Sequence, residues 1–301
     1  MIYPAFGGDR CRRSFWMDVR EIETSPGLVF DASVGGPEDG PLVLMLHGFG
    51  VSRHFWQAQV PALAAAGFRA VAPNQRGYAK GARPDTTDLD AYRMDRLIGD
   101  ALDIAAASNP GGGRFHLVGH DWGASLAWAI ADRHPERLAS LTILSRPHPT
   151  SFAEALAMPD GEQKRRSGHH TAFLDPDAGP RLLANDCEWL RTRLGKSGVP
   201  ADKIGAHLSV LGNPEAMEAA LAWYRARGER QPIKPTEVPT LYLWGDADDT
   251  VGRAAAEGTG RFITAPYRFE ILPGVGHYAA DQVPDKVNAL LLAHLARHPI
   301  Q

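Results

Sequence analysis

The chain has 301 residues, a length that suits two domains or one large α/β domain with an insertion. Its 32 lysines and arginines against 35 aspartates and glutamates give a net charge of −3, which leaves no broad basic surface for nucleic acid or anionic lipid. The two cysteines, Cys11 and Cys187, lie far apart and in no metal-binding or redox spacing, which disfavours a disulfide scaffold and a cysteine-based zinc site.

The N-terminal residues carry scattered charges and no uninterrupted apolar stretch of about 7–15 residues, so a signal peptide is not predicted. No window approaches the roughly 18 apolar residues of a membrane span. We therefore expect a cytoplasmic protein without a membrane span. We interpret residues 1–26 as an N-terminal extension and assign them no function.

Short apolar runs predict the buried strands of a parallel sheet, because they are continuous and do not alternate with polar residues. These runs are Leu42–Leu46, Phe68–Ala72, Phe115–Val118, Leu138–Leu144, Thr240–Trp244 and the weaker Arg268–Leu272. Helices are predicted between them, at Phe55–Ala66, Tyr92–Ala107, Ala124–Arg133, Ala254–Phe262 and Val283–Ala296. The alternation predicts an α/β fold, with a mostly parallel sheet flanked by helices and joined by right-handed crossovers.

One region interrupts this alternation. From Thr150 to about Gln231 the sequence predicts no strand, only helical segments such as Leu182–Leu194 and Ala216–Ala226. Strand-type sequence resumes after Pro239, so we interpret residues 150–231 as a helical cap and not as a separate all-α domain. The core domain then comprises residues 27–149 and 232–301, and the cap would cover the C-terminal edge of its sheet, where open α/β sheets bind ligands.

The segment Gly119-His120-Asp121-Trp122-Gly123 joins a predicted strand to a predicted helix, as a nucleophile elbow does. Serine is the central residue in G-x-S-x-G hydrolases, whereas here it is Asp121. A carboxylate can attack carbon and form an ester, so we expect its electrophile to be a saturated carbon that carries a leaving group. Taken alone, Asp121 also fits a helix N-cap. The flanking glycines, together with the base and acid described below, favour the role of nucleophile over that of a helix N-cap.

The loop His47-Gly48-Phe49-Gly50 follows the first strong strand and also fits an ordinary turn. In this architecture it would place the Phe49 amide beside the Trp122 amide, as a pair of donors for a developing oxyanion. The two aromatic side chains would form an apolar wall, which favours a hydrophobic substrate.

A base and its orienting acid are expected after the nucleophile in chain order. His277 lies in a glycine-rich loop after the last predicted strand, the best position among the 12 histidines. Asp246, Asp248 and Asp249 directly follow the strand Thr240–Trp244, and each could orient the imidazole. Spacing alone does not choose among them.

These residues resemble the α/β-hydrolase superfamily, and within it the epoxide hydrolase and haloalkane dehalogenase branch. The resemblance spans roughly residues 27–298, and its most specific mark is the aspartate in the elbow. Weaker marks are His47-Gly48-Phe49, Arg76-Gly77-Tyr78, Pro147-His148-Pro149, Trp223-Tyr224-Arg225, Gly245-Asp246-Ala247-Asp248 and Gly276-His277. The resemblance implies that Asp248 is the acid, with Asp246 and Asp249 as alternatives. The residues expected to contact the substrate are His47, Phe49, Trp122, His148 and Tyr278.

The resemblance also implies that Tyr224, in the predicted cap, donates a proton to the oxygen that leaves an opened epoxide. A packing role between cap helices is the alternative. Many relatives carry a second cap tyrosine in an R-S-x-Y segment, where this chain reads Arg166-Ser167-Gly168-His169-His170. We therefore expect His169, or its neighbour His170, to be the second donor.

Two departures from the family pattern affect the expected substrate. Gly50 stands where many members carry proline, so the loop that bears the Phe49 amide is expected to be less fixed. The elbow is followed by Trp122-Gly123-Ala124 and not by the arginine of fluoroacetate dehalogenases, which argues against a small carboxylate.

We expect an epoxide hydrolase that acts on a small-molecule hydrophobic epoxide. Asp121 would form an alkyl ester, and His277, held by Asp248, would activate the water that releases a vicinal diol. This chemistry requires no cofactor and no metal. A haloalkane dehalogenase with the same three residues is the main alternative, although that branch typically carries asparagine where Phe49 stands. A non-catalytic ligand-binding homologue is a further alternative, and the oligomeric state, monomer or homodimer, stays open.

Overall fold

The computed structural model describes residues 17–24, 27–159, 161–228 and 233–300. Its central feature is an eight-stranded sheet with the order β1-β2-β4-β3-β5-β6-β7-β8. Neighbouring strands from β4 to β8 are parallel. They are β3 (Leu42–Leu46), β4 (Arg69–Pro73), β5 (Phe115–His120), β6 (Leu138–Leu144), β7 (Thr240–Gly245) and β8 (Tyr267–Leu272). The predicted fold class and the six predicted strands are therefore confirmed.

Two further strands were missed at the sequence level. β1 (Asp18–Thr24) pairs antiparallel with β2 (Leu28–Gly35), and β2 pairs antiparallel with β4. Most side chains of β1 are exposed, so this edge strand has no continuous apolar run that could reveal it. The sheet thus begins before residue 27, inside the stretch interpreted as an extension. Residues 1–16 of that stretch lie outside the described residues.

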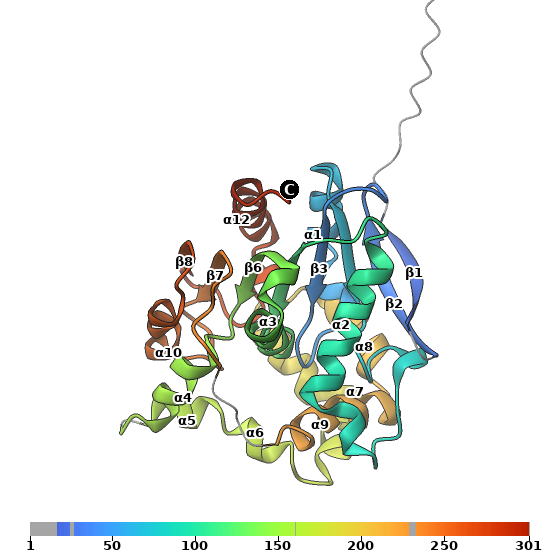
Figure 1. The fold of residues 1–301 in the computed structure, drawn as a ribbon. Helices are drawn as coiled ribbons and strands as arrows, with labels where there is room; N and C mark the ends of the chain where they lie inside the picture. The colour runs from blue at the N-terminus through green and yellow to red at the C-terminus, as the bar shows by residue number, and fades with distance from the viewer. Residues whose placement is uncertain (1–16, 25–26, 160, 229–232, 301) are drawn as a thin grey trace, which may run out of the picture.

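Helices cover both faces of the sheet (Figure 1). α2 (Met94–Ser108) packs against α3 (Trp122–Arg133) on one face, and α1 (Gln59–Ala65) packs against α12 (Pro284–Arg297) on the other. The remaining short elements of this part are η1 (Arg53–Trp56), η2 (Lys80–Ala82), η3 (Leu89–Tyr92), η4 (Pro135–Arg137), α10 (Arg253–Gly258), η5 (Thr259–Phe262) and α11 (Ala279–Gln282).

The described residues between β6 and β7 form helices and no strand of the sheet. These helices are α4 (Pro149–Ala157), α5 (Glu162–Arg166), α6 (His169–Ala172), α7 (Ala178–Lys196), α8 (Ala201–Leu211) and α9 (Pro214–Arg225), hereafter the helical segment. Figure 1 places the helical segment below the sheet, at the end where β6 runs into α4. Its division from the core at residues 150 and 231 stays a prediction, and Gln231 lies outside the described residues. None of the helices in the described ranges is long and apolar enough to cross a bilayer.

Candidate active site

Asp121 lies in the tight turn between β5 and α3, with φ of 50° and ψ of −112°. This backbone conformation is rare for a residue other than glycine, and such strain is concentrated at functional sites. The turn requires both of its glycines. A Cβ on Gly119 would collide with the carbonyl oxygen of Gly123, and a Cβ on Gly123 would collide with the carbonyl oxygen of Leu46.

The Asp121 carboxylate is buried, and among the hydrogen bonds of the described residues it accepts through one oxygen. The Phe49 N–H donates to Asp121 Oδ1 at 3.0 Å, whereas Oδ2 lies 3.8 Å from His277 Nε2. Burial raises the pKa of Asp121, but the neighbouring rings of His277 and His120 and the Phe49 N–H lower it by more. The net pKa is well below the usual aspartate value. At neutral pH the site therefore holds a buried anion with one oxygen available to react.

One of the two predicted oxyanion donors, the Phe49 amide, contacts Asp121, and the part of the Trp122 amide stays a prediction. The Phe49 amide already contacts Oδ1, and a Cβ on the preceding residue, Gly48, would collide with Asp121 itself. α3 begins at Trp122, whose N–H has no partner within the helix because it belongs to the first turn. Any negative charge that develops on Oδ1 would thus meet the Phe49 N–H directly.

His277 is held by Asp248, which satisfies the geometry expected of a base and its acid. His277 Nδ1 lies 3.0 Å from Asp248 Oδ2 and 3.2 Å from Oδ1. Asp248 also accepts hydrogen bonds from the Ser145 hydroxyl at 2.7 Å and from the Thr250 N–H at 2.7 Å. Burial lowers the pKa of His277, but the charges of Asp248 and Asp121 raise it by more, so that it lies above 6.5.

The two alternative acids are directed elsewhere. Asp246 Oδ1 accepts a hydrogen bond from the Gly274 N–H at 2.7 Å. Asp249 forms an exposed ion pair with Arg193 of the helical segment, with distances of 3.0 and 3.1 Å. Of the three aspartates that follow β7, only Asp248 contacts His277 among the described hydrogen bonds.

A small cavity of about 20 Å³ lies over Asp121. It is lined by Phe49, Asp121, His169, Phe173, Trp189, Arg193, Tyr224, Thr250, His277 and Tyr278. The base and the cap donors predicted from the sequence therefore meet around the same carboxylate, although their side chains come from distant parts of the chain.

Tyr224 lies on α9 and is packed among aromatic rings. Its ring centroid is 5.4 Å from Phe49, 5.1 Å from Trp122 and 5.0 Å from Phe173. Burial and the charge of Asp121 raise the pKa of Tyr224 well above 10, against a smaller opposing effect of a hydrogen bond from the Trp122 side chain. The phenol therefore stays protonated at neutral pH.

His169 and His170 have different surroundings, although their ring centroids lie 4.4 Å apart. His169 lines the cavity, whereas His170 lies 3.4 Å from the Arg227 guanidinium and is not among the lining residues. Burial lowers the pKa of His169 to about 4, so its ring is neutral near pH 7 and can donate only through its single N–H.

Three of the residues expected to contact substrate lie outside this cavity. The His47 ring is fully buried, with Nδ1 3.0 Å from the Gly48 carbonyl oxygen and Nε2 accepting from the Gln75 N–H at 3.3 Å. His148 caps α4 and stacks on Phe262 at 5.1 Å. Neither ring lines the cavity over Asp121, so the structure does not support the predicted substrate contact of His47 and His148.

Trp122 contacts Tyr224, but its side chain lines another cavity, of about 450 Å³, together with Phe152 and Arg146. Of the predicted contact residues, Phe49 and Tyr278 are the ones on the wall over Asp121.

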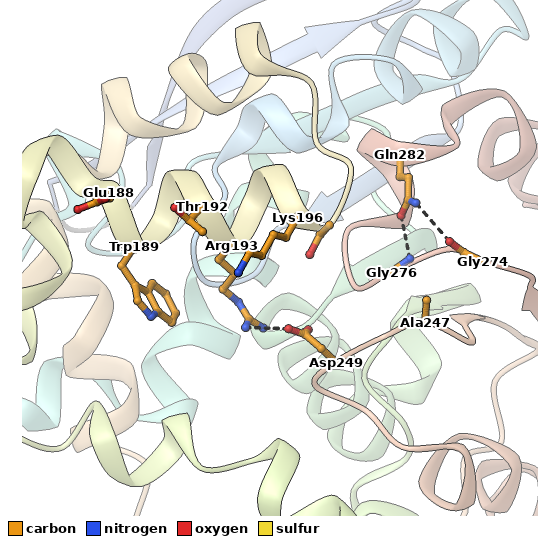
Figure 2. A pocket seen from close by; sticks show the side chains of 11 residues that line it. Glu188, Trp189, Thr192, Arg193, Lys196, Ala247, Asp249, Gly274, Gly276 and Gln282 are labelled. Atoms are coloured by element: carbon orange, nitrogen blue, oxygen red, sulfur yellow. Dashed lines mark hydrogen bonds and ion pairs between the residues drawn. The ribbon is translucent and has the colours of Figure 1, made fainter.

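A larger outer pocket of about 720 Å³ adjoins the cavity over Asp121 (Figure 2). Trp189 and Arg193 of α7 line both spaces, and Figure 2 shows the Arg193 side chain directed at Asp249 across the pocket. The other lining residues are Glu188, Thr192, Lys196, Ser197, Ala247, Gly274, Gly276 and Gln282. The Arg193–Asp249 pair therefore lies at the junction between the outer pocket and the reacting carboxylate.

Several site residues were missed at the sequence level: Ser145, Phe173, Trp189, Arg193 and Thr250. They belong to no motif, and their positions depend on how the helical segment packs on the core. Within residues 17–24, 27–159, 161–228 and 233–300, no group of three or more histidine, cysteine, aspartate or glutamate side chains is arranged to hold a metal ion.

Known proteins are similar to this chain in sequence. The model of the α/β hydrolase fold family matches residues 41–284. The chain is 31% identical over 277 residues to the AB hydrolase superfamily protein YfhM of Bacillus subtilis, covering 89% of this chain and 95% of that protein. It is 30% identical over 282 residues to epoxide hydrolase 4 of Mus musculus, covering 89% and 77%.

A solved structure is also similar along the whole chain. It is described as one of the novel epoxide hydrolases from metagenomes of hot environments, and it superposes with a TM-score of 0.81 at 28% identity, covering 94% of this chain and 100% of that one.

Proposed function

The chain belongs to the α/β hydrolase fold family as an epoxide hydrolase-like member, and we propose that it converts a hydrophobic epoxide into a vicinal diol. The observation that carries this proposal is the arrangement around Asp121. A buried carboxylate with one oxygen free of the described hydrogen bonds faces His277 on one side and the neutral donors Tyr224 and His169 across a small cavity.

In the first step Asp121 Oδ2 attacks an oxirane carbon and the C–O bond breaks. The new bond makes an alkyl ester, and the departing oxygen takes the proton of the Tyr224 phenol, with an N–H of His169 as a second hydrogen bond. Oδ2 is the reacting oxygen because Oδ1 is already held by the Phe49 N–H.

In the second step His277 Nε2 removes a proton from water, and the hydroxide attacks Cγ of the ester. Negative charge then develops on Oδ1, where the Phe49 N–H, joined by the Trp122 N–H, stabilises it. When the intermediate collapses, the diol oxygen takes the proton held by His277. Asp121 is released as the acid, and its proton restores the Tyr224 phenol.

The apolar character of the site supports a hydrophobic substrate. Phe49, Phe173 and Trp189 line the cavity over Asp121, and the larger outer pocket provides the approach to it. Since the cavity itself holds about 20 Å³, substrate entry requires the Trp189 and Arg193 side chains to move. This movement must break the Arg193–Asp249 ion pair and the hydrogen bond from Arg193 to the Thr250 hydroxyl at 2.9 Å.

Haloalkane dehalogenation uses the same nucleophile but needs ring N–H donors for a halide, and not a proton donor. The Tyr224 phenol, which stays protonated at neutral pH and lines the cavity over Asp121, supplies such a proton donor and favours the epoxide. The test is incubation of the protein with a panel of aryl and alkyl epoxides and of haloalkanes. We expect diol from epoxides and no halide release. Halide release without diol formation would favour the dehalogenase, and binding without turnover would favour a ligand-binding protein.

A further inference from the structure

Ser145, directly after β6, has a strained backbone that no sequence motif explains. Its φ is 67°, and the Arg146 N–H donates to the Leu144 carbonyl at 2.9 Å, which closes a three-residue turn around it. A γ-turn with positive φ at its central residue is rare and strained. Of the non-glycine residues described with positive φ, Ser145 and Asp121 are the two that lie at the site.

The turn is fixed from the neighbouring strand β7. The Ser145 N–H donates to the Leu243 carbonyl at 2.9 Å, and the Tyr242 hydroxyl donates to the Ser145 carbonyl at 2.7 Å. Strain of this kind persists only where the surroundings hold it, and it is commonly found where a side chain must be aimed at a functional group.

The side chain of Ser145 is aimed at the base and its acid together. Its hydroxyl donates to Asp248 Oδ2 at 2.7 Å and lies 2.9 Å from His277 Nδ1. In the tautomer of neutral His277 that leaves Nε2 free to accept a proton from water, the hydrogen is on Nδ1. That hydrogen is therefore shared between the Asp248 carboxylate and the lone pair of the Ser145 oxygen.

We propose that Ser145 is a positioning residue, which acts through Asp248 to set the strength of His277 as a base. The proposal rests on the proposed function, because it assigns His277 to ester hydrolysis. The hydroxyl draws part of the negative charge of Oδ2 away from the imidazole, while Oδ1 is held by the Thr250 and Val251 N–H groups. Without the hydroxyl, Oδ2 acts on His277 more strongly and the imidazolium becomes more stable.

The other titratable groups around His277 stay in place when Ser145 is replaced. They are Asp121 at 3.8 Å, the rings of His120 and Tyr278 with centroids at 4.8 and 4.9 Å, and Arg193 on the cavity wall. A change in the titration of His277 after substitution of Ser145 would thus come through Asp248 and the lost hydroxyl.

The test is the titration of His277 followed by NMR on histidine-labelled protein, which needs no substrate. We expect Ser145→Ala to raise the pKa of His277 by about 0.5–1 unit, the size that one hydrogen bond can produce. In single turnovers with an epoxide at a pH below the pKa of His277, ester hydrolysis should slow about 3–10-fold, and its rising limb should move to higher pH by the same 0.5–1 unit. Ester formation, in which His277 takes no part, should keep its rate.

Two further variants separate the hydroxyl from the backbone. Ser145→Gly accepts positive φ without strain but lacks the hydroxyl, so we expect the same shift as in Ser145→Ala. If Ser145→Ala fails to fold, Ser145→Gly takes its place in the titration of His277. Ser140→Ala is the matched control, since Ser140 is also a buried serine beside a histidine. Its hydroxyl lies 2.8 Å from His116 Nδ1, and no described hydrogen bond joins it to His277 or Asp248. This control should leave the titration unchanged.

An unchanged His277 titration in folded Ser145→Ala and Ser145→Gly would overturn the proposal and leave Ser145 with a structural role only. Wild-type behaviour of Ser145→Gly alone would likewise overturn it, because the alanine effect would then come from backbone strain. If the wild-type protein forms no diol from any epoxide, the proposed function fails, while the titration still decides the role of Ser145.

Discussion

His277 Nε2 lies 3.8 Å from Asp121 Oδ2, while Nδ1 of the same ring lies 3.0 Å from Asp248. The imidazole therefore stands between two carboxylates, but it hydrogen-bonds only one of them, since 3.8 Å is too long for a hydrogen bond. Asp248 orients the ring, and Asp121 keeps an oxygen free to react. The division of roles between the two aspartates follows from this difference.

Removal of the Tyr224 hydroxyl should slow ester formation. Tyr224→Phe keeps the aromatic packing against Phe49 and Trp122 but leaves the departing oxygen without its proton donor. We expect a fall of about 10²–10³-fold in the ester-formation rate, the usual contribution of a general acid. Stopped-flow single turnovers measure this rate. A fall in ester hydrolysis alone would contradict the role given to Tyr224.

The neighbouring histidines of α6 provide a matched pair. His169→Ala removes a ring from the cavity wall, whereas His170→Ala removes one beside Arg227. We expect His169→Ala to lower kcat/KM for epoxides about tenfold, as the loss of a second hydrogen bond to the departing oxygen predicts. His170→Ala should stay near the wild-type value. The reverse order in steady-state assays would transfer the donor role to His170.

The rate of ester hydrolysis should rise with pH. His277 acts as a base only when neutral, and in the ester, where Asp121 carries no charge, Asp248 is the carboxylate that raises the pKa of His277 against the effect of burial. The rising limb is therefore expected to follow the loss of the proton from the His277 imidazolium. Asp248→Asn removes the carboxylate charge that raises the pKa of His277, so the rising limb should move to lower pH. The rate of ester hydrolysis should also fall by about 10³–10⁴-fold. A pH profile of single-turnover hydrolysis that is flat from pH 6 to 9 would exclude His277 as the base.

Much of the fold follows from local patterns, and much of the site does not. The strands of the parallel sheet are apolar on both faces, so their runs are visible in the sequence, whereas β1 is mostly exposed and carries no such run. Asp121 is recognisable because two glycines bracket it in a strand–turn–helix context. By contrast, the choice of Asp248 over Asp246 depends on which side chain reaches His277.

The contribution of the helical segment is the least predictable part of the site. Arg193 and Trp189 reach the cavity only because α7 packs over the loop after β7. His148 lies in a Pro-His-Pro segment that resembled a family mark, yet its ring packs on Phe262. Such placements depend on contacts between residues distant in sequence, which periodicity and motif spacing do not encode.

A buried polar junction should hold α8 of the helical segment to the core. His207 Nε2 lies 3.0 Å from Asp281, its Nδ1 accepts from the Ser52 N–H at 3.1 Å, and Lys203 lies 2.6 Å from Asp281. His207→Ala would leave two buried partners unsatisfied, so we expect the free energy of unfolding to fall by about 2–4 kcal/mol. Urea denaturation measures this change. His134→Ala, at a partly exposed histidine, is the control and should change stability by less than about 0.5 kcal/mol.

The most direct test of the account is a single turnover of an epoxide in ¹⁸O-labelled water, with mass analysis of the peptide that carries Asp121 and of the diol. The account predicts that the label enters the Asp121 carboxylate and that the first diol carries none, because its new oxygen comes from the enzyme. Label in the first diol with none in Asp121 would contradict covalent catalysis by this carboxylate.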